Sequence, residues 1–177
     1  MTLDIDISPD DYDSVTIETT RCKLTIFENC DRALVMRLCT DAKVRHFLGG
    51  VVDEKTIRYK FWEMLKPNSE AHYWVIRAKD SSSLKEIGIV SLTQHHNNID
   101  TEVSYQLLPE WWGKGYGTEV VGAIVSYALT VMNLPRVVAE TQMANTASCC
   151  LLESVGMRLE RTVERFGAKQ TIYATQL

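Results

Sequence analysis

The sequence predicts a single α/β domain, or α+β domain, in which helices flank a mixed, mostly antiparallel central sheet. Three strand-like runs at 73–78, 87–93 and 101–108 are separated only by polar turns, which is typical of an antiparallel meander. The last run is followed by a segment with helical periodicity and then by a β-branched run at 136–141. A strand, a helix and a second strand in this order predict a right-handed crossover between parallel strands.

The chain before the meander begins with an acidic segment and one further strand. Residues 1–14 contain five aspartates and no lysine or arginine, so we expect a flexible, solvated arm, followed by one domain over 15–177. The run CKLTIF at 22–27 alternates as a strand does. Asn29 or Asp31 is a candidate cap for the helix that follows.

Apolar spacing predicts three helices before the meander and two after it. Two short helices are divided near Thr40-Asp41, a third covers 53–65, and the last covers 146–155. These helices end at residues that favour turns, namely Gly49-Gly50, Pro67-Asn68, Pro135 and Gly156. The core-facing stripe of the fourth helix consists of Val121, Ile124, Val125, Ala128, Leu129 and Met132. A hairpin around Gly167 completes the chain.

A glycine-rich segment lies where the third strand of the meander gives way to the fourth helix. Gly113, Gly115 and Gly117 alternate within the run WWGKGYGT at 111–118. Glycine lets the backbone approach a ligand closely, and the unpaired N–H groups at the start of a helix attract anions. The segment therefore predicts a phosphate-binding loop, with Lys114 as an added positive charge. The alternative is a tight turn that only packs the helix against the strand.

Two common phosphate loops do not fit these residues. The dinucleotide-binding fingerprint requires a glycine three residues after Gly115, where Thr118 stands. The P-loop requires a glycine, four further residues and then Gly-Lys-Ser or Gly-Lys-Thr. This spacing is absent from the segment. Neither class of nucleotide-binding loop is therefore predicted.

The segment resembles the acyl-CoA loop of the GNAT acetyltransferases, in which Gln/Arg-x-x-Gly-x-Gly/Ala follows a strand that ends in Val-x-Pro. Here the strand ends at Pro109, and Trp112 replaces the usual Gln or Arg. The run WGKGY, followed by Gly-Thr-Glu, is similar to the branch that contains the ribosomal-protein N-terminal acetyltransferases. The run TTRCKLTIF at 19–27 also resembles the opening of that branch.

A second GNAT signature is similar to the region after the crossover. The residues Asn145 to Ser148, an aliphatic helix, Gly156 and Met157 resemble Asn-x-x-Ser/Ala followed by Gly-Phe, with Met157 in place of phenylalanine. The resemblance covers nearly the whole chain from about residue 19. It implies the GNAT-type acyl-CoA acyltransferase fold and acetyl-CoA as the acyl donor.

The resemblance also implies how the donor is held. The main chain of Leu107 and Leu108 is expected to pair with the pantetheine arm like an added strand, while a strand N–H polarises the thioester carbonyl. The acetyl group would pass directly to an amine, without a covalent enzyme intermediate. The residues expected to bind the cofactor are Leu107, Leu108, Gly113, Lys114, Gly115, Tyr116, Gly117, Thr118, Asn145 and Ser148.

Ser148 is the first of two candidate catalytic residues. Helix capping accounts for Asn145 but not for Ser148, which lies three residues further into the helix. The resemblance implies that the Ser148 hydroxyl assists the departing sulfur of CoA. Many GNAT enzymes have a tyrosine four residues later as general acid, but Leu152 stands there and cannot donate a proton. Ser148 itself or a bound water is then expected to serve.

Glu102 is the second candidate. Strand alternation places Glu102, Ser104 and Gln106 on one face, which in the simplest interpretation is a solvated strand face. The run Glu102-Val-Ser-Tyr resembles the Glu-x-Gly-Tyr of the same branch, in which the carboxylate lies near the acceptor amine and acts through water as a base. Both interpretations stay open.

Four other polar residues have open roles. His95 and His96 are expected to be exposed loop residues, with a role as base in second place. Glu140 either orients the substrate or covers the sheet edge. Tyr173 belongs either to the core or to the acceptor site.

Composition narrows the function classes. The chain has 177 residues, 45% hydrophobic residues and a net charge of −4, which argues against binding to nucleic acid or anionic membranes through bulk charge. Its acidic N-terminus is not expected to be a secretory signal, and the sequence contains no apolar stretch of membrane length. Five cysteines without CxxC spacing predict reduced thiols in a cytoplasmic protein, with no metal site.

The predicted reaction is acetylation of a primary amine. A free α-amine is the expected acceptor, because it deprotonates more easily than lysine and because the similar branch modifies protein N-termini. The alternatives are a small amine such as a polyamine, an amino acid or an aminoglycoside, or an acyl-CoA-binding sensor without catalysis. A monomer and a homodimer are both compatible with the sequence.

Overall fold

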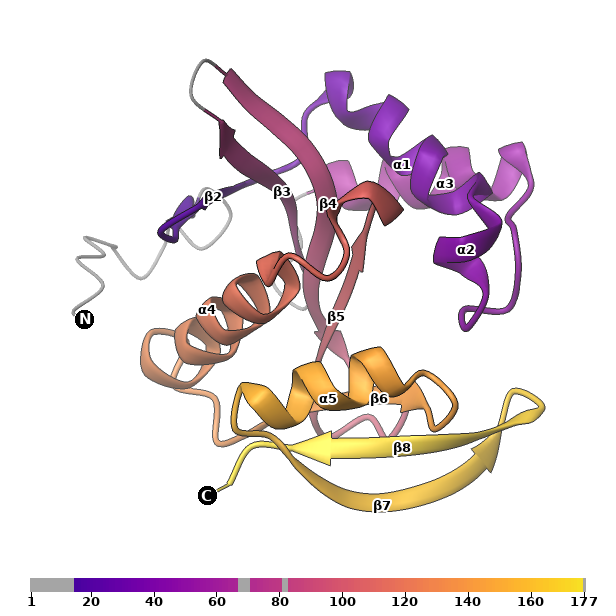
Figure 1. Ribbon diagram of the computed structural model, residues 1–177, viewed down its shortest axis with the longest axis vertical. Coiled ribbons are helices and arrows are strands. Elements are labelled where there is room, and N and C mark those ends of the chain that lie inside the picture. Colours follow the sequence, from indigo (N-terminus) through magenta and orange to yellow (C-terminus); the bar gives the residue numbers. More distant parts are fainter. Residues whose placement is uncertain (1–14, 67–70, 81–82, 177) are drawn as a thin grey trace.

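Eight strands form one mixed sheet in the computed structural model, which describes residues 15–66, 71–80 and 83–176 (Figure 1). The predicted acidic arm at 1–14 and the Pro67-Asn68 helix stop lie outside the described residues. The strands are β1 (Ile17–Glu18), β2 (Cys22–Thr25), β3 (His72–Asp80), β4 (Ser83–Gln94), β5 (Thr101–Leu107), β6 (Val137–Gln142), β7 (Arg158–Arg165) and β8 (Ala168–Ala174).

The strand order is β1-β2-β3-β4-β5-β6-β8-β7. β5 and β6 pair in parallel, and all other described neighbours pair antiparallel. The predicted crossover and the mixed, mostly antiparallel sheet are confirmed. The predicted hairpin is also confirmed, since β7 and β8 are joined at Phe166 and Gly167, whose φ angles are +56° and +73°.

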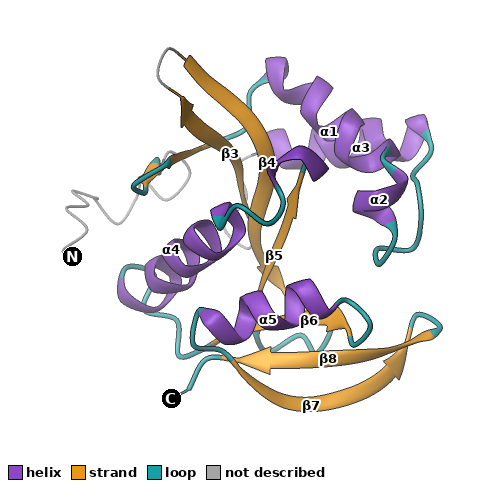
Figure 2. Cartoon of the chain, in the orientation of Figure 1, coloured by secondary structure: helices purple, strands orange, loops and turns teal. Residues whose placement is uncertain are grey.

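Each face of the sheet has its own layer of helices (Figure 2). The helices are α1 (Arg32–Thr40), α2 (Ala42–Arg45), α3 (Glu54–Leu65), α4 (Tyr116–Thr130) and α5 (Thr146–Ser154), with short 3-10 turns η2 (Asn29–Asp31) and η3 (Pro109–Trp111). Because side chains alternate along a strand, Val75 packs with α1 to α3 while Trp74 and Ile76 pack with α4. The sheet therefore separates two apolar clusters.

The predicted stripe of α4 is largely correct. Val121, Ile124, Val125 and Ala128 are buried against the sheet. The helix ends at Thr130, however, so Met132 lies beyond it. The α5 stop at Gly156 is confirmed, with a left-handed φ of +87°.

Asp31 differs from its predicted role. It occupies the N-cap position of α1, but its carboxylate makes no capping hydrogen bond to that helix. Instead, Asp31 Oδ2 accepts from Glu28 N–H at 2.8 Å in a capping box of the turn η2. Asp31 Oδ1 accepts a hydrogen bond from Arg77 Nη2 at 2.7 Å, and both residues are buried. Arg77 Nη1 also pairs with Glu86, within the polar turn predicted at 80–86. β3 and β4 extend into that predicted turn, to Asp80 and from Ser83.

β5 and β6 pair only where they begin. Their register joins Thr101 to Val137 and Glu102 to Val138, and none of the described residues continues it. On its other side, β5 pairs with β4 as far as Leu107. The edge of β5 that faces β6 is therefore free of strand pairing beyond Glu102, and the pocket described below lies there.

The cysteines are all unpaired, and both Cys22 and Cys39 are buried. Within the described ranges, no cluster of three or more His, Cys, Asp and Glu side chains is arranged to bind a metal ion. No helix in the described part of the chain has both the length and the apolar character required to cross a lipid bilayer.

Candidate active site

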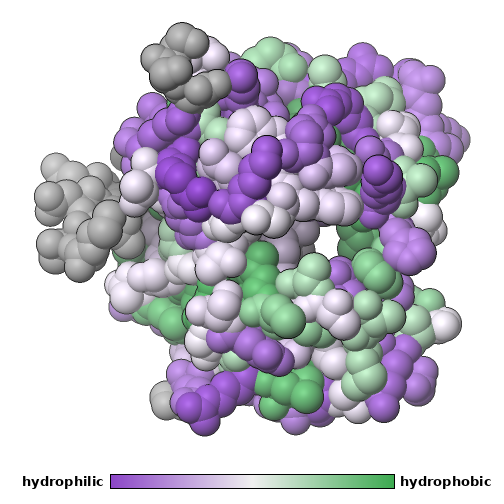
Figure 3. Space-filling model, viewed as in Figure 1, coloured by the Kyte–Doolittle hydropathy of each residue, from purple (hydrophilic) through white to green (hydrophobic). Residues whose placement is uncertain are grey.

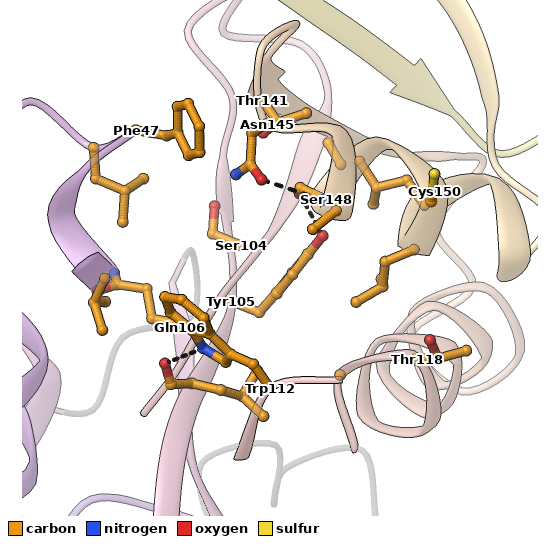
Figure 4. Close-up of a pocket in the computed structure, with 18 of the residues that line it drawn as sticks. Phe47, Ser104, Tyr105, Gln106, Trp112, Thr118, Thr141, Asn145, Ser148 and Cys150 are labelled. Atoms are coloured by element: carbon orange, nitrogen blue, oxygen red, sulfur yellow. Dashed lines mark hydrogen bonds between the residues drawn. The ribbon is translucent and has the colours of Figure 1, made fainter. Parts of the chain in front are cut away.

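A pocket of about 870 Å³ occupies the gap between the diverging ends of β5 and β6. Its walls come from α2 and the segment after it, β5, the loop before α4, the end of β6 and the start of α5 (Figure 4). The space-filling view shows the molecule hollowed between the α2 segment and α5 (Figure 3). Since α2 and α5 cover opposite faces of the sheet, the pocket connects these faces.

Glycine is required at the three positions of the loop for two different physical reasons. Gly113 and Gly115 have φ angles of +69° and +79°, which side chains disfavour. Gly117 is helical, but a Cβ there would lie 2.7 Å from Leu151 Cδ1. Gly113 and Gly115 therefore shape the loop, whereas Gly117 lets α4 approach α5. All three line the pocket.

The start of α4 offers backbone N–H groups of the kind that bind anions. The N-cap residue is Gly115, which has no side chain that could accept a hydrogen bond from the first N–H groups of the helix. The N–H groups of Tyr116, Gly117 and Thr118 have no acceptor within the helix, and the positive end of the helix dipole lies with them. These groups fit a diphosphate without requiring a basic side chain.

Arg21 neutralises the one acidic residue in the first turn of α4. Glu119 accepts hydrogen bonds from Thr19 Oγ1, Arg21 N and Arg21 Nε at 2.6, 2.7 and 2.6 Å. Burial acts to raise the pKa of Glu119, but these hydrogen bonds outweigh it and lower the pKa. Arg21 also donates to Lys114 O at 2.9 Å and lies over the Tyr116 ring. It therefore braces the loop while removing a repulsive charge from the anion site.

Lys114 and Tyr116 are not among the residues that line the pocket. Lys114 Nζ lies 5.4 Å from the centre of the Trp111 ring, and the Tyr116 ring packs edge-on against the same tryptophan. Their side chains therefore support the loop from behind. The added positive charge predicted for Lys114 is directed at this ring.

The free edge of β5 differs by one residue from the predicted one. Leu108 N–H bonds to Ile87 O at 2.8 Å, and Leu108 O accepts from Trp111 N at 2.9 Å. Main-chain groups of successive residues point to opposite edges of a strand, so Tyr105 and Leu107 direct theirs to the gap. Trp112 Nε1 already donates to Leu107 O at 2.8 Å (Figure 4). The edge available to an added strand thus runs from Tyr105 to Leu107, and Leu108 is buried behind it.

Two hydroxyl groups meet at the start of α5. Asn145 is the helix cap, as predicted, because its Oδ1 accepts from Ser148 N at 3.3 Å. The Ser148 hydroxyl takes no part in this cap and lies 2.6 Å from the Tyr105 hydroxyl (Figure 4). Burial raises the pKa of Tyr105 to about 12, against the lowering effect of the Ser148 hydrogen bond. Tyr105 is therefore protonated at neutral pH.

Glu140 is the buried carboxylate of the pocket wall, with a side chain 6% exposed. Its Oε2 contacts His95 Nε2 at 2.9 Å and Arg165 Nη1 at 3.2 Å. Because His95 Nδ1 accepts from Asn97 N–H at 3.3 Å, we assign the ring proton to Nε2, which then donates to Glu140. Glu140 Oε1 is buried and has no hydrogen-bond partner among the described residues.

The prediction that His95 is an exposed loop residue is wrong. His95 is only 1% exposed, since its ring is held between Glu140 and the turn at Asn97. His96 is exposed, as predicted, and contacts Phe166. For Tyr173, the core alternative holds: the ring is buried and its hydroxyl donates to Glu153 Oε1 at 3.0 Å.

Glu102 lies beside Glu140 but behind the pocket surface. Its Oε1 is 3.4 Å from both Ser104 Oγ and Glu140 N. Ser104 lines the pocket and Glu102 does not. Burial raises the pKa of Glu102, with the charge of nearby Glu140 adding to the effect. Any contact between Glu102 and a ligand would therefore pass through Ser104 or through a water molecule.

The segment after α2 forms the opposite wall. Phe47 and Leu48 line the pocket, and Arg45 holds this segment by donating to Gly50 O at 2.9 Å and to Leu48 O. Gln142 Nε2, at the end of β6, donates to Phe47 O at 3.1 Å. The two walls are thus joined by one hydrogen bond across 95 residues of sequence.

Two pocket features were missed by the sequence analysis. The alternation of β5 placed Tyr105 on the face opposite Glu102, but nothing in the pattern showed that this face meets Ser148. Gln106 lines the pocket with a buried Oε1 that has no partner among the described residues. Its only signal was its position on the face of Glu102 and Ser104.

Comparison with known proteins identifies the family of this chain. The family profile of the acetyltransferase (GNAT) domain matches residues 21–158. The chain is 26% identical to the uncharacterised protein YkkB of Bacillus subtilis over 161 residues, which are 88% of this chain and 92% of that protein. It is 32% identical to the uncharacterised N-acetyltransferase YoaA of the same species over 94 residues, about half of each chain (52%).

Solved structures share the fold at low sequence identity. A GNAT-family acetyltransferase from Bacillus anthracis has a TM-score of 0.76 and 23% identity, over 90% of this chain and 97% of that one. A spermidine N-acetyltransferase from Vibrio cholerae, in complex with CoA and spermine, has a TM-score of 0.72 and 18% identity, over 88% of this chain and 94% of that one. The chain therefore belongs to the GNAT acetyltransferase family and has its fold. Acetyl-CoA is the acyl donor of this family in general.

Proposed function

We propose that this protein transfers the acetyl group of acetyl-CoA directly to a free α-amine, on a peptide or protein N-terminus or on a small molecule. The main support is the charge of the acceptor side of the pocket. Glu140 is the one carboxylate among the described lining residues, whereas Lys43 and His46 line the opposite wall, at α2. This distribution of charge suits an acceptor with a single ammonium group.

The cofactor half would act mainly through its backbone. Residues 113–118, with Gly113, Lys114, Gly115, Tyr116, Gly117 and Thr118, would surround the diphosphate. The pantetheine arm would pair with the edge of β5 at Leu107, with Leu108 as its buried support. A β5 N–H that points into the gap, from Tyr105 or Leu107, would polarise the thioester carbonyl. Asn145 would hold the start of α5, so that the Ser148 hydroxyl reaches the departing sulfur.

Proton affinity favours the α-amine because only a neutral amine attacks the thioester. An α-amine with a pKa of about 7.7 to 8.0 is roughly one tenth neutral at pH 7, whereas lysine with a pKa of about 10.4 is neutral in roughly four molecules per ten thousand. In this proposal the negative charge of the Glu140 carboxylate, whose Oε1 has no hydrogen-bond partner among the described residues, attracts the incoming ammonium. Glu102 accepts its proton through Ser104 or a water molecule.

The resemblance of WGKGY and its flanking residues to ribosomal-protein N-terminal acetyltransferases supports a protein N-terminus as acceptor. The small-molecule alternative rests on the spermidine N-acetyltransferase that shares the fold. A polyamine or an aminoglycoside carries several positive charges, which a wall with one carboxylate, itself paired with Arg165, would not balance. An amino acid, with one amine and one carboxylate, fits Glu140 and Lys43 better.

The test is a comparison of acceptors with acetyl-CoA, followed by mass spectrometry. One short peptide is offered with its N-terminus free and its lysine blocked, and the same peptide with the reverse blocking; spermidine and a free amino acid are the other acceptors. We expect the free α-amine to be modified fastest. Faster modification of the lysine-only peptide or of spermidine would contradict the α-amine proposal, and the absence of turnover with every amine would favour the acyl-CoA sensor.

A further inference from the structure

A hydrogen bond between two side chains of the pocket joins a strand to a helix on one side of the gap. The Tyr105 hydroxyl on β5 lies 2.6 Å from the Ser148 hydroxyl on α5, 43 residues away (Figure 4). The Tyr105 ring is partly buried against the core cluster that the sheet, α4 and α5 share, and both side chains line the pocket. The tyrosine is therefore fixed in place, with its hydroxyl directed at Ser148.

The sequence pattern indicates no polar partner for Ser148 on its own helix, because Leu152 stands where many GNAT enzymes have a tyrosine. Leu152, one helical turn later, is only 1% exposed and packs in the core. The phenol reaches Ser148 from β5 instead, so a tyrosine is present beside the serine although the helix does not provide it.

The direction of the hydrogen bond follows from acidity. A phenol is more acidic than an aliphatic alcohol, so it is the better donor, and the serine oxygen is the better acceptor. When Tyr105 donates to Ser148 Oγ, the serine hydrogen is free to point into the pocket. Consecutive hydrogen bonds also polarise each other, which strengthens the second donor.

We propose that Tyr105 is a positioning residue that orients the Ser148 hydroxyl toward the departing sulfur, so that CoA leaves as a hydrogen-bonded thiolate. This inference rests on the proposed acetyl transfer. The amine nitrogen forms its bond to the thioester carbon, and the C–S bond breaks with its electron pair on sulfur. The amine proton goes to the base or to water, and the thiolate later takes a proton from water.

Full proton transfer from Tyr105 to sulfur does not fit the order of acidities. Burial raises the pKa of Tyr105 to about 12, whereas a thiol has a pKa of about 8.5. Moving the proton from this phenol to a thiolate is therefore unfavourable by more than a thousandfold. The pair stabilises negative charge on sulfur while both hydroxyl protons stay in place.

The first test is an equilibrium measurement that requires no acceptor. CoA is bound to the wild type, Tyr105→Phe, Ser148→Ala and the control Tyr73→Phe, a half-buried tyrosine of β3 away from the pocket. The pKa of its thiol is then followed by the ultraviolet absorbance of the thiolate. We expect this pKa to rise by about one unit in Ser148→Ala, by less in Tyr105→Phe and not at all in Tyr73→Phe.

A thiol pKa that is equal in the wild type and in Tyr105→Phe would overturn the inference while leaving acetyl transfer intact. Failure of the wild type to bind CoA would instead overturn the proposed function. The two failures are therefore distinguishable.

The second test is a double-mutant cycle on turnover. We expect kcat to fall about 10- to 30-fold in Ser148→Ala and about 3- to 10-fold in Tyr105→Phe, with little change in acetyl-CoA affinity. The double variant should be no slower than Ser148→Ala, because Tyr105 acts through Ser148. The ratio of wild-type to Tyr105→Phe activity should also be constant from pH 6 to 9. Losses that multiply in the double variant, or a ratio that changes with pH, would contradict positioning through Ser148.

Discussion

The two halves of the pocket are built from different parts of the chain. The proposed cofactor half, apart from Asn145 and Ser148 on α5, consists of adjacent sequence: the end of β5, the glycine loop and the start of α4, all between 105 and 118. The acceptor half combines the segment after α2, Ser104, Glu140 and its partners His95 and Arg165, which come from separate elements. The first half offers mainly backbone groups, and the second half offers side chains. Contiguous backbone sites leave a pattern in sequence, whereas assembled side-chain sites do not.

The largest effect should come from adding negative charge to the backbone half. Gly113→Glu should weaken acetyl-CoA binding by roughly 100-fold, because a carboxylate would face the diphosphate. Gly113→Gln is the matched control: it has the same shape and the same strain at φ +69°, and a Cβ at Gly113 meets no other atom within 4 Å. Calorimetry of both variants isolates the charge. Equal affinities would show that no anion binds at this loop.

Substitutions in the side-chain half should change the turnover rate and not the affinity for acetyl-CoA. Glu102→Gln cannot accept a proton, so we expect about tenfold slower turnover at pH 7, with partial recovery at high pH where the amine deprotonates by itself. Acetyl-CoA affinity should be unchanged. The exposed Glu164→Gln on β7 is the control. Full activity of Glu102→Gln at neutral pH would remove Glu102 from the mechanism.

Glu102→Gln should lower turnover, but it should raise the thermal stability of the protein at neutral pH. Burial raises the folded-state pKa of Glu102 above its ordinary value of 4.5. Its contribution to stability is therefore complete below pH 4.5 and is lost as the pH rises through the raised pKa. Glu102→Gln should raise the melting temperature at pH 7.5, on the order of 1–3 °C, and change it little at pH 4. A lower melting temperature at pH 7.5 would contradict a costly buried charge.

A smaller effect is expected from the support of the glycine loop. Arg21→Ala should weaken acetyl-CoA binding about fivefold, since Glu119 would lose its neutralising partner and Lys114 O its donor. Lys23→Ala, two residues later in the exposed neighbourhood of Glu18, should leave binding unchanged. If both variants bind acetyl-CoA equally well, the loop does not depend on this brace.

The smallest effect should arise from the link between the two acceptor walls. Gln142→Ala removes the hydrogen bond to Phe47 O and should raise the acceptor KM about two- to threefold. The affinity for acetyl-CoA should be unaffected because neither residue belongs to the cofactor half. A change confined to acetyl-CoA binding would show that the two halves of the pocket are not independent.

Much of the fold was determined by the sequence because its signals are local. The stripe of α4, the glycine stop of α5 and the alternation of the meander depend on neighbours only a few residues apart. Asn145 was identified as a cap for the same reason. The sequence did not indicate that Arg77, 46 residues away, pairs with Asp31 Oδ1, or that Asp31 Oδ2 caps the turn η2 at Glu28 N–H and not the helix α1.

The candidate site also combines features that local sequence predicts with features that it does not. The glycine loop could be predicted, because positive φ angles and a helix start require particular residues at fixed spacing. Only the tertiary structure decided that Tyr105 meets Ser148, that His95 is buried against Glu140, and that β5 and β6 separate beyond Glu102. Each of these contacts joins residues about 40 positions apart, or depends on the twist of the whole sheet. Such distances are set by packing, which no local pattern records.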